Sequence, residues 1–345
     1  MNYDRVFFCQ AYNDISYILA SIELEKFESN LIIVVDNYKI LQFLENLNIQ
    51  KTHCIFISRK LNTLKNPFQI MNEIVNIRRI KKQILSNLNG LKITVYATMI
   101  DLLTCSCIEV LRKNNDIYLG IPVLESDNFI PSDKTSLKIK FLSKIYKTKL
   151  QSFQSIFNKV GGLPLNYVDK YLKEDYIFDK LRLLSIRKKY SKNHPVSKNP
   201  FILLLDTKIN TDFRFYKNNH SLKMSKIFNF LSRYETHLKG HPRLGPSVLA
   251  TDYDFKIIDK GIPVDYIDLS NCVCVVGMIS QALVDIADLD IKSISLLKYV
   301  DFEDVNLKNK YIKSLTVKGN SSIDFPESID DFELLINRHT TEGLR

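Results

Sequence analysis

This sequence of 345 residues has no apolar stretch close to the ~18–20 residues that a transmembrane helix needs. We also expect no signal peptide, because the apolar run at 6–9 is much shorter than a signal core and directly follows Asp4 and Arg5. Both absences predict a protein that stays in the cytoplasm.

Metal-binding patterns are missing as well. The six cysteines include the pairs Cys105/Cys107 and Cys272/Cys274, which lack the CxxC spacing of a zinc site. The six histidines are scattered and form no HExxH motif, and no DxD motif stands at a plausible strand end. We therefore expect no metal, no cofactor, and buried free thiols in a cytosolic protein.

The composition is that of a globular protein, with 45% hydrophobic and 25% charged residues. The length is sufficient for two domains. A formal net charge of +10 favours an anionic partner, such as a nucleotide, an anionic glycan, a lipid headgroup or a nucleic acid. The alternative explanation of this positive charge is a lysine-rich composition of the kind that AT-rich genomes encode, which needs no anionic partner. No RNP, helix-turn-helix or zinc pattern is present, so we expect no nucleic-acid partner.

The N-terminal half alternates buried strands with amphipathic helices. Continuous β-branched runs of this kind are typical of parallel strands that are buried on both faces. They predict a doubly wound α/β domain over residues 1–190. The predicted strands are 6–9, 31–35, 54–57 and 93–97. The first predicted helix begins at Asn13 or Asp14, and three more helices are predicted at 38–47, 70–85 and 102–111.

The loop after the first predicted strand, at 10–13, lacks the G-x-G-x-x-G fingerprint of a dinucleotide site. This domain therefore need not hold a dinucleotide. We assign it to the acceptor side of a two-domain enzyme, with Asn13 and Asp14 as candidates for acceptor binding.

Two acidic residues, Glu125 and Asp127, follow the strand region predicted at 117–124. Ligands bind at the carboxyl ends of strands in an open parallel sheet, so these carboxylates are candidates for a general base. A turn rich in Asp and Asn is the alternative interpretation.

Lysines alternate with apolar residues over 134–160, and from Phe141 onward the segment is predicted to form a basic amphipathic helix. The helix is stopped by Gly161, Gly162 and Pro164. Such a helix either lies on an anionic membrane surface or packs its apolar face on the core and exposes its lysines.

The C-terminal half starts a second α/β set after a linker predicted at 191–200, within a segment with two prolines, many charges and almost no apolar residues. The second domain covers 201–323, and Asp206 and Thr207 follow its first strand. The tail at 324–345 holds an acidic helix that we expect to pack back on the N-terminal domain. Two Rossmann-like domains facing a central cleft are the outline of a GT-B glycosyltransferase.

Two motifs in this half suit a phosphorylated ligand. His241, Pro242 and Arg243 form a basic turn at the end of a predicted strand. About forty residues on, Gly277 ends a buried strand and Ser280 and Gln281 open a helix. A helix start offers free N–H groups and partial positive charge to a phosphate. The ordinary alternatives are a chance His-Pro pair and a serine that only caps its helix.

The two motifs, residues 239–243 and 277–280, resemble the HP and Ser motifs of bacterial GT-B sialyltransferases, which include lipooligosaccharide sialyltransferases and capsular polysialyltransferases. Residues 201–207 resemble the apolar strand that opens their nucleotide-binding domain. The acidic motif of that family, an acidic pair followed by glycine, is represented weakly by residues 125–127, where the glycine is missing. The likeness covers residues 201–290.

The resemblance implies a CMP-activated nonulosonic sugar as donor, transferred with inversion and without a metal to a glycan or glycolipid acceptor at the cytoplasmic membrane. His241 would stabilise the leaving phosphate together with Ser280, and Asp127 or Glu125 would take the acceptor proton. The alternatives are a related enzyme that uses CMP-Kdo, CMP-legionaminic or pseudaminic acid, or CDP-glycerol, and a non-enzymatic protein that binds polyanions.

Overall fold

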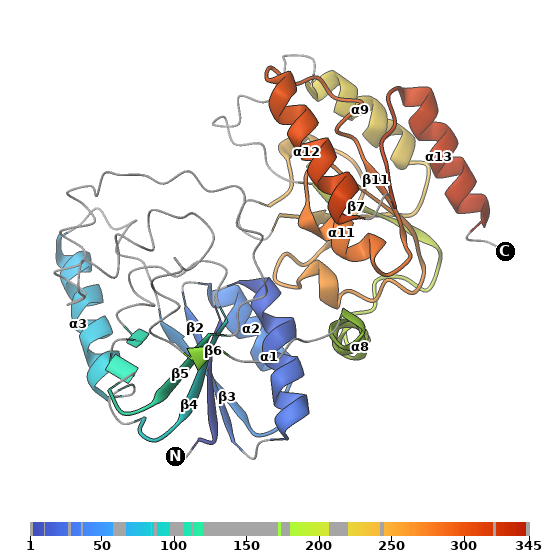
Figure 1. Ribbon diagram of the computed structural model, residues 1–345. Coiled ribbons are helices and arrows are strands. Elements are labelled where there is room, and N and C mark those ends of the chain that lie inside the picture. Colours follow the sequence, from blue (N-terminus) through green and yellow to red (C-terminus); the bar gives the residue numbers. More distant parts are fainter. Residues whose placement is uncertain are drawn as a thin grey trace. The chain divides into compact units, whose positions relative to one another are not determined.

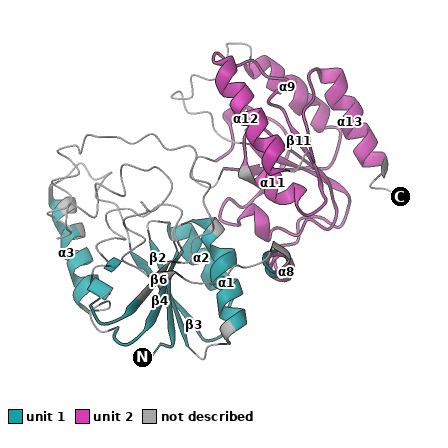
Figure 2. Ribbon diagram, in the orientation of Figure 1, with its two compact units in different colours: residues 1–186 teal, residues 187–345 magenta. Residues whose placement is uncertain are grey.

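The computed structural model describes residues 3–9, 11–26, 29–35, 37–57, 67–83, 85, 88–96, 107–108, 110–111, 113–119, 172–173, 180–206, 220–241, 245–319 and 322–342. The chain divides into two compact units, Met1–Ile186 and Arg187–Arg345 (Figure 2). Each unit is built on its own six-stranded parallel sheet (Figure 1).

The sheet of the first unit has the strand order β3-β2-β1-β4-β5-β6. The chain begins in the middle of the sheet, moves outward on one side and returns to the other side of β1, which is the Rossmann arrangement. The elements are β1 (Arg5–Cys9), α1 (Tyr12–Glu25), β2 (Asn30–Val35), α2 (Tyr38–Asn46), β3 (Thr52–Ile57), α3 (Pro67–Gln83), β4 (Lys92–Tyr96), β5 (Asp116–Leu119), β6 (Leu172–Lys173) and α8 (Lys180–Ser191), which continues into the second unit.

The strand β1 illustrates why these sequences form a buried parallel sheet. Val6 and Phe8 are fully buried in a cluster that includes Ile77 of α3. Phe7 points to the opposite face, because side chains alternate along a strand, and it is also fully buried. Both faces of the strand are covered, so its sequence is a continuous apolar run.

The second unit repeats the topology of the first. Its order β12-β11-β10-β7-β8-β9 places the first strand, β7, between β8 and β10. The predicted fold class, α/β with two Rossmann-like domains, is therefore confirmed. The elements are β7 (Phe201–Asp206), α9 (His220–Leu231), β8 (Thr236–Gly240), α10 (Val248–Thr251), β9 (Lys256–Ile258), the 3-10 helix η3 (Val264–Tyr266), β10 (Cys272–Gly277), α11 (Gln281–Ala287), β11 (Lys292–Ser295), α12 (Val305–Lys318), β12 (Ile323–Asp324) and α13 (Ile329–Glu342).

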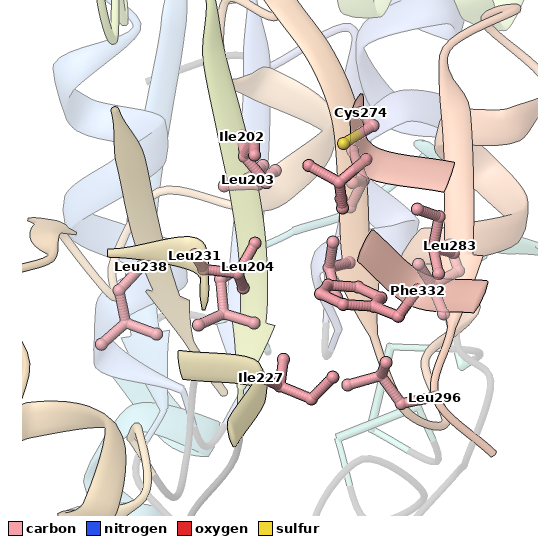
Figure 3. Packing of buried hydrophobic residues seen from close by; sticks show 14 of the residues in the cluster. Ile202, Leu203, Leu204, Ile227, Leu231, Leu238, Cys274, Leu283, Leu296 and Phe332 are labelled. Carbon is pink, nitrogen blue, oxygen red and sulfur yellow. The ribbon is translucent and has the colours of Figure 1, made fainter. Parts of the chain in front are cut away.

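The C-terminal helix α13 belongs to the core of the second unit. Figure 3 shows Phe332 of α13 among strand residues such as Leu203 and Cys274 and the helix residue Ile227. Phe332 and Ile336 are both fully buried there. The buried residues of this helix therefore contribute to the core of the unit that contains it. The apolar face of the helix packs on the sheet of its own unit, where it shields apolar strand residues from water.

The segment predicted as a linker, 191–200, is attached to the second unit. Pro195 forms a parallel bridge with Asp268, and Asn271 donates a hydrogen bond to the carbonyl of Ser197. Val196 packs against the core. The unit boundary lies earlier, after Ile186, inside α8, which continues through charged residues to Ser191. Among the described helices, none has both the length and the apolar character of a membrane span.

Candidate functional site

The candidate site lies at the carboxyl ends of three adjacent strands in the second unit. In the sheet, β7 pairs with β8 on one side and with β10 on the other, and Asp206 lies opposite Gly240. The chain leaves β7 toward β8 and later returns to β10, so the strand order reverses at β7. In open α/β sheets this switch point is where ligands bind.

The turn after β8 is tied to the end of β7. The backbone N–H of His241 donates to the carbonyl of Asp206 at 2.9 Å, and the N–H of Gly245 donates to the carbonyl of His241 at 2.8 Å. The Asp206 carboxylate accepts a hydrogen bond from the N–H of Ser247 at 2.6 Å. His241 is solvent-exposed. Its backbone is therefore fixed at the sheet edge while its side chain is accessible to a ligand.

Two glycines allow this turn to fold tightly. A Cβ on Gly240 would lie 2.5 Å from Cδ of Pro246 and 2.6 Å from its nitrogen, which no real side chain tolerates. Gly245 has a φ of +77°, in the left-handed region that favours glycine. Gly245 and Pro246 are not among the site residues predicted from the sequence, although a Gly-Pro pair is itself a turn signal.

The turn after β10 is held by β11. The N–H of Leu296 donates to the carbonyl of Gly277 at 2.9 Å, and the hydroxyl of Ser295 donates to the carbonyl of Met278 at 2.8 Å. A Cβ on Gly277 would meet Cβ of Leu205 at 3.2 Å, so glycine lets β10 and the end of β7 approach closely.

Ser280 is the N-cap of α11, with an extended φ of −144° and ψ of 131°. Its Oγ accepts a hydrogen bond from the N–H of Ala282 at 3.2 Å. The serine therefore fulfils the ordinary capping role. Its hydroxyl hydrogen is not used by that bond, so the side chain can still donate to a ligand.

A further histidine near this sheet edge was not singled out from the sequence. His220 is the first residue of α9, the helix that follows β7 in the chain. A helix that connects parallel strands runs back along the sheet, so its start lies toward the carboxyl ends. Burial lowers the pKa of His220 to about 4, and the side chain is therefore neutral at pH 7. The only sequence signal is a histidine just before a predicted helix.

Lys239, within the His-Pro motif, has a structural contact. Its side chain is buried, and its Nζ donates to the carbonyl of Asp259 at 3.0 Å. The ammonium group thus joins β8 to the residue that follows β9.

The remaining predicted residues are distributed over both units. Asp14 is buried in α1, and its carboxylate accepts a hydrogen bond from the N–H of Ala11 at 2.8 Å. Asn13 lies in the first turn of α1, and Gln281 is the first residue of α11. The predicted base and several donor contacts lie outside the described residues: Glu125, Asp127, Thr207, Pro242 and Arg243.

The described part of the chain contains no group of three or more His, Cys, Asp or Glu residues that could hold a metal ion. Its free thiols include Cys9, Cys107 and Cys274, which are buried. Burial raises the pKa of Cys54 and of Cys272 to about 12, so both remain protonated at neutral pH. These cysteines are poor nucleophiles in their present surroundings.

No family model matches this chain, and no curated protein matches it significantly. Solved structures that are similar over nearly the whole length include the following three. The UDP-GlcNAc 2-epimerase from Methanocaldococcus jannaschii has 14% identity and a TM-score of 0.43, with 98% of this chain and 99% of that chain covered. The E. coli heptosyltransferase WaaC with ADP has 13% identity and a TM-score of 0.46, with 97% and 99% covered. The family 9 glycosyl transferase from Veillonella parvula DSM 2008 has 11% identity and a TM-score of 0.40, with 100% and 98% covered.

Proposed function

We propose that this chain is a GT-B glycosyltransferase that moves sialic acid, or a related nonulosonic sugar, from a CMP-activated donor to a surface glycan. One observation carries the proposal. His241 and Ser280 lie at the carboxyl ends of β8 and β10, on either side of β7, so two motifs about forty residues apart share one edge of a Rossmann-like sheet.

The chemistry of such a donor suits these residues. CMP leaves as a phosphate monoester, and the transition state develops charge on that phosphate. The exposed imidazole of His241 donates a hydrogen bond or proton to it, and the hydroxyl of Ser280 donates a second bond. Further donor contacts come from Asp206, Thr207, Pro242, Arg243, Gly277 and Gln281.

The acceptor side completes the reaction with inversion and without a metal. A carboxylate removes the proton of the acceptor hydroxyl as that oxygen attacks the anomeric carbon and CMP departs. We favour Asp127 for this role, with Glu125 as its neighbour, and Asn13 for acceptor binding. Asp14 is the third candidate, although its carboxylate is buried and already bonded to the backbone of Ala11. The reaction takes place at the inner face of the cytoplasmic membrane, with the lysine-rich segment 134–150 as one contact.

A thermal-shift panel of CMP, CDP, UDP and GDP tests the donor class. A ligand at a hundred times its dissociation constant stabilises the folded protein by about 2.7 kcal/mol, which gives a clear melting shift. Only CMP and CMP-sugars should produce it. A donor-hydrolysis assay with CMP-sialic acid, CMP-Kdo and CDP-glycerol then identifies the sugar. Stabilisation by UDP or GDP alone would overturn the proposal.

A further inference from the structure

The strand β9 (Lys256–Ile258) is the outermost strand of the second sheet, where it pairs with β8. In the part of this unit that the structure describes, no further strand lies along its outer side. The backbone N–H and C=O groups of that side are therefore a template for another strand. Addition of a strand to such an edge is a common mode of protein recognition.

The second unit holds this edge in an extended conformation. Phe255 and Ile258 are both buried in the core, and they anchor the segment at its two ends. The carbonyl of Asp259 accepts a hydrogen bond from Nζ of Lys239 at 3.0 Å, and its carboxylate accepts one from the N–H of Gly261 at 2.7 Å. A partner strand therefore meets a preformed edge, and little conformational entropy is lost when it binds.

The centre of the edge is apolar and exposed. Ile257 keeps 66% of its surface accessible to solvent, although Leu238, its neighbour in β8, is fully buried. Lysines often protect an edge strand from pairing. Here the Nζ of Lys256 donates to the carboxylate of Glu235 at 2.9 Å, so its charge is already matched within the unit. The apolar centre of β9 is therefore open to a partner.

The charges around Ile257 complement one another under a twofold rotation. In an antiparallel pair of β9 strands centred on Ile257, Asp254 of one copy faces Lys260 of the other, and this contact occurs twice. Both residues are exposed. Opposite charges across two strands stabilise their pairing, and like charges weaken it. In a neighbouring register Asp254 would face Asp259, so the charges select the register centred on Ile257.

We propose that β9 pairs with β9 of a second copy of this chain, in an antiparallel arrangement centred on Ile257. The two isoleucines cover each other, and the two Asp254–Lys260 pairs flank them. Each copy contributes the same surface, so the interface closes as a dimer. The segment 252–260 carries three aspartates and two lysines. This mixture of charges suits a copy of itself better than an anionic membrane or polymer, which the carboxylates would repel.

Charge reversal tests the pairing by sedimentation velocity over a wide range of protein concentrations. The wild type should show an equilibrium between monomer and dimer. D254K and K260D should each weaken dimerisation roughly tenfold, because each change replaces two attractions with two repulsions. The double variant D254K/K260D should recover the affinity of the wild type, since opposite charges again face each other. The matched control, Lys313→Asp, reverses an exposed charge on α12 and should leave dimerisation unchanged.

Three results would overturn the proposal. The first is a wild type that is monomeric at every concentration, which would leave the edge for a different protein or for no partner. The second is a double variant that dimerises no better than the single variants. The third is a dimer that none of these changes affects, which would place the contact elsewhere on the chain.

A cysteine variant tests the centre of the interface. In Ile257→Cys, the introduced thiols of the two copies face each other with Cβ atoms about 4.5–5.5 Å apart, and a small shift allows a disulfide. The control Val317→Cys lies on α12 and has a similar exposure of 70%. Mild oxidation should give a covalent dimer above the wild-type level for Ile257→Cys only. Equal crosslinking of both variants, or none of Ile257→Cys, would refute the assignment. None of these measurements involves a nucleotide or sugar transfer, so their outcome is independent of the proposed function.

Discussion

Replacement of Glu235 by Gln should destabilise the second unit by removing the centre of a charged hydrogen-bond cluster. The carboxylate accepts bonds from Ser197 Oγ at 2.6 Å, Lys256 Nζ at 2.9 Å and His237 Nε2 at 3.1 Å. These partners come from the segment before β7, from β9 and from β8. The side chain of Glu235 has an exposed fraction of only 20%.

The magnitude follows from the pKa of this carboxyl group. The hydrogen bonds from Ser197, Lys256 and His237, in that order of effect, lower the pKa of Glu235 to about 2. The full shift from 4.5 would correspond to about 3 kcal/mol. Lys256 is 65% exposed, so water screens part of the interaction. We expect a loss of about 1–2 kcal/mol in the free energy of unfolding at pH 7.

The pH dependence has a definite sign. The pKa of Glu235 is depressed in the folded state, so its stabilisation is present above the unfolded pKa and disappears as the pH falls from about 4.5 toward about 2. Urea denaturation of wild type and Glu235→Gln, followed by circular dichroism at pH 7 and pH 3, should therefore show a difference that shrinks at the lower pH.

The matched control is Glu327→Gln, which removes an ion pair with Lys298 in which the glutamate side chain is 70% exposed. Exposed pairs contribute about 0–1 kcal/mol. A Glu235→Gln protein no less stable than this control, or a difference that grows as the pH falls, would refute the reasoning.

Four other outcomes are expected. Folded His241→Ala should lose roughly 10²–10⁴-fold in turnover, and near-normal turnover would remove it from the site. Asp127→Asn should keep CMP-induced stabilisation and lose transfer; if it and Glu125→Gln both transfer at the wild-type rate, the base lies elsewhere. Activity should survive EDTA, and rescue of an inactivated enzyme by Mg²⁺ or Mn²⁺ would contradict this. Phe332→Ala should lower the free energy of unfolding, measured by urea denaturation, by about 3–5 kcal/mol. The control Leu334→Ala should change it little, because Leu334 is 70% exposed.

The candidate site could be predicted from the sequence only in part. Strand endings and turn residues located His241 and Ser280, since His241 opens a basic turn after a predicted strand and Ser280 follows an apolar run. Their meeting at one sheet edge depends on the order β10-β7-β8, which no local pattern contains. The capping bond of Ser280 agrees with the simple interpretation of a serine before an apolar run.

Side-chain partners distant in the sequence were beyond local analysis. In the sequence, Glu235 is recognisable only as a residue at the start of a strand, yet its carboxylate accepts hydrogen bonds from Ser197 and Lys256. The exposed and buried sides of α3 could not be told apart, because Ile77 and Val75 are equally apolar in sequence. Only the packing of the helix decides that the first is 4% exposed and the second 58%.

The sequence by itself determined the fold class and the strands β1–β4, because apolar periodicity depends on local burial, and a strand covered on both faces must be apolar throughout. Tertiary structure alone decided strand order, the attachment of 191–200 to the second unit and the burial of α13 within it. These features depend on which apolar face meets which neighbour. Many pairings satisfy the same hydrophobic pattern, and only the close packing of the whole unit selects among them.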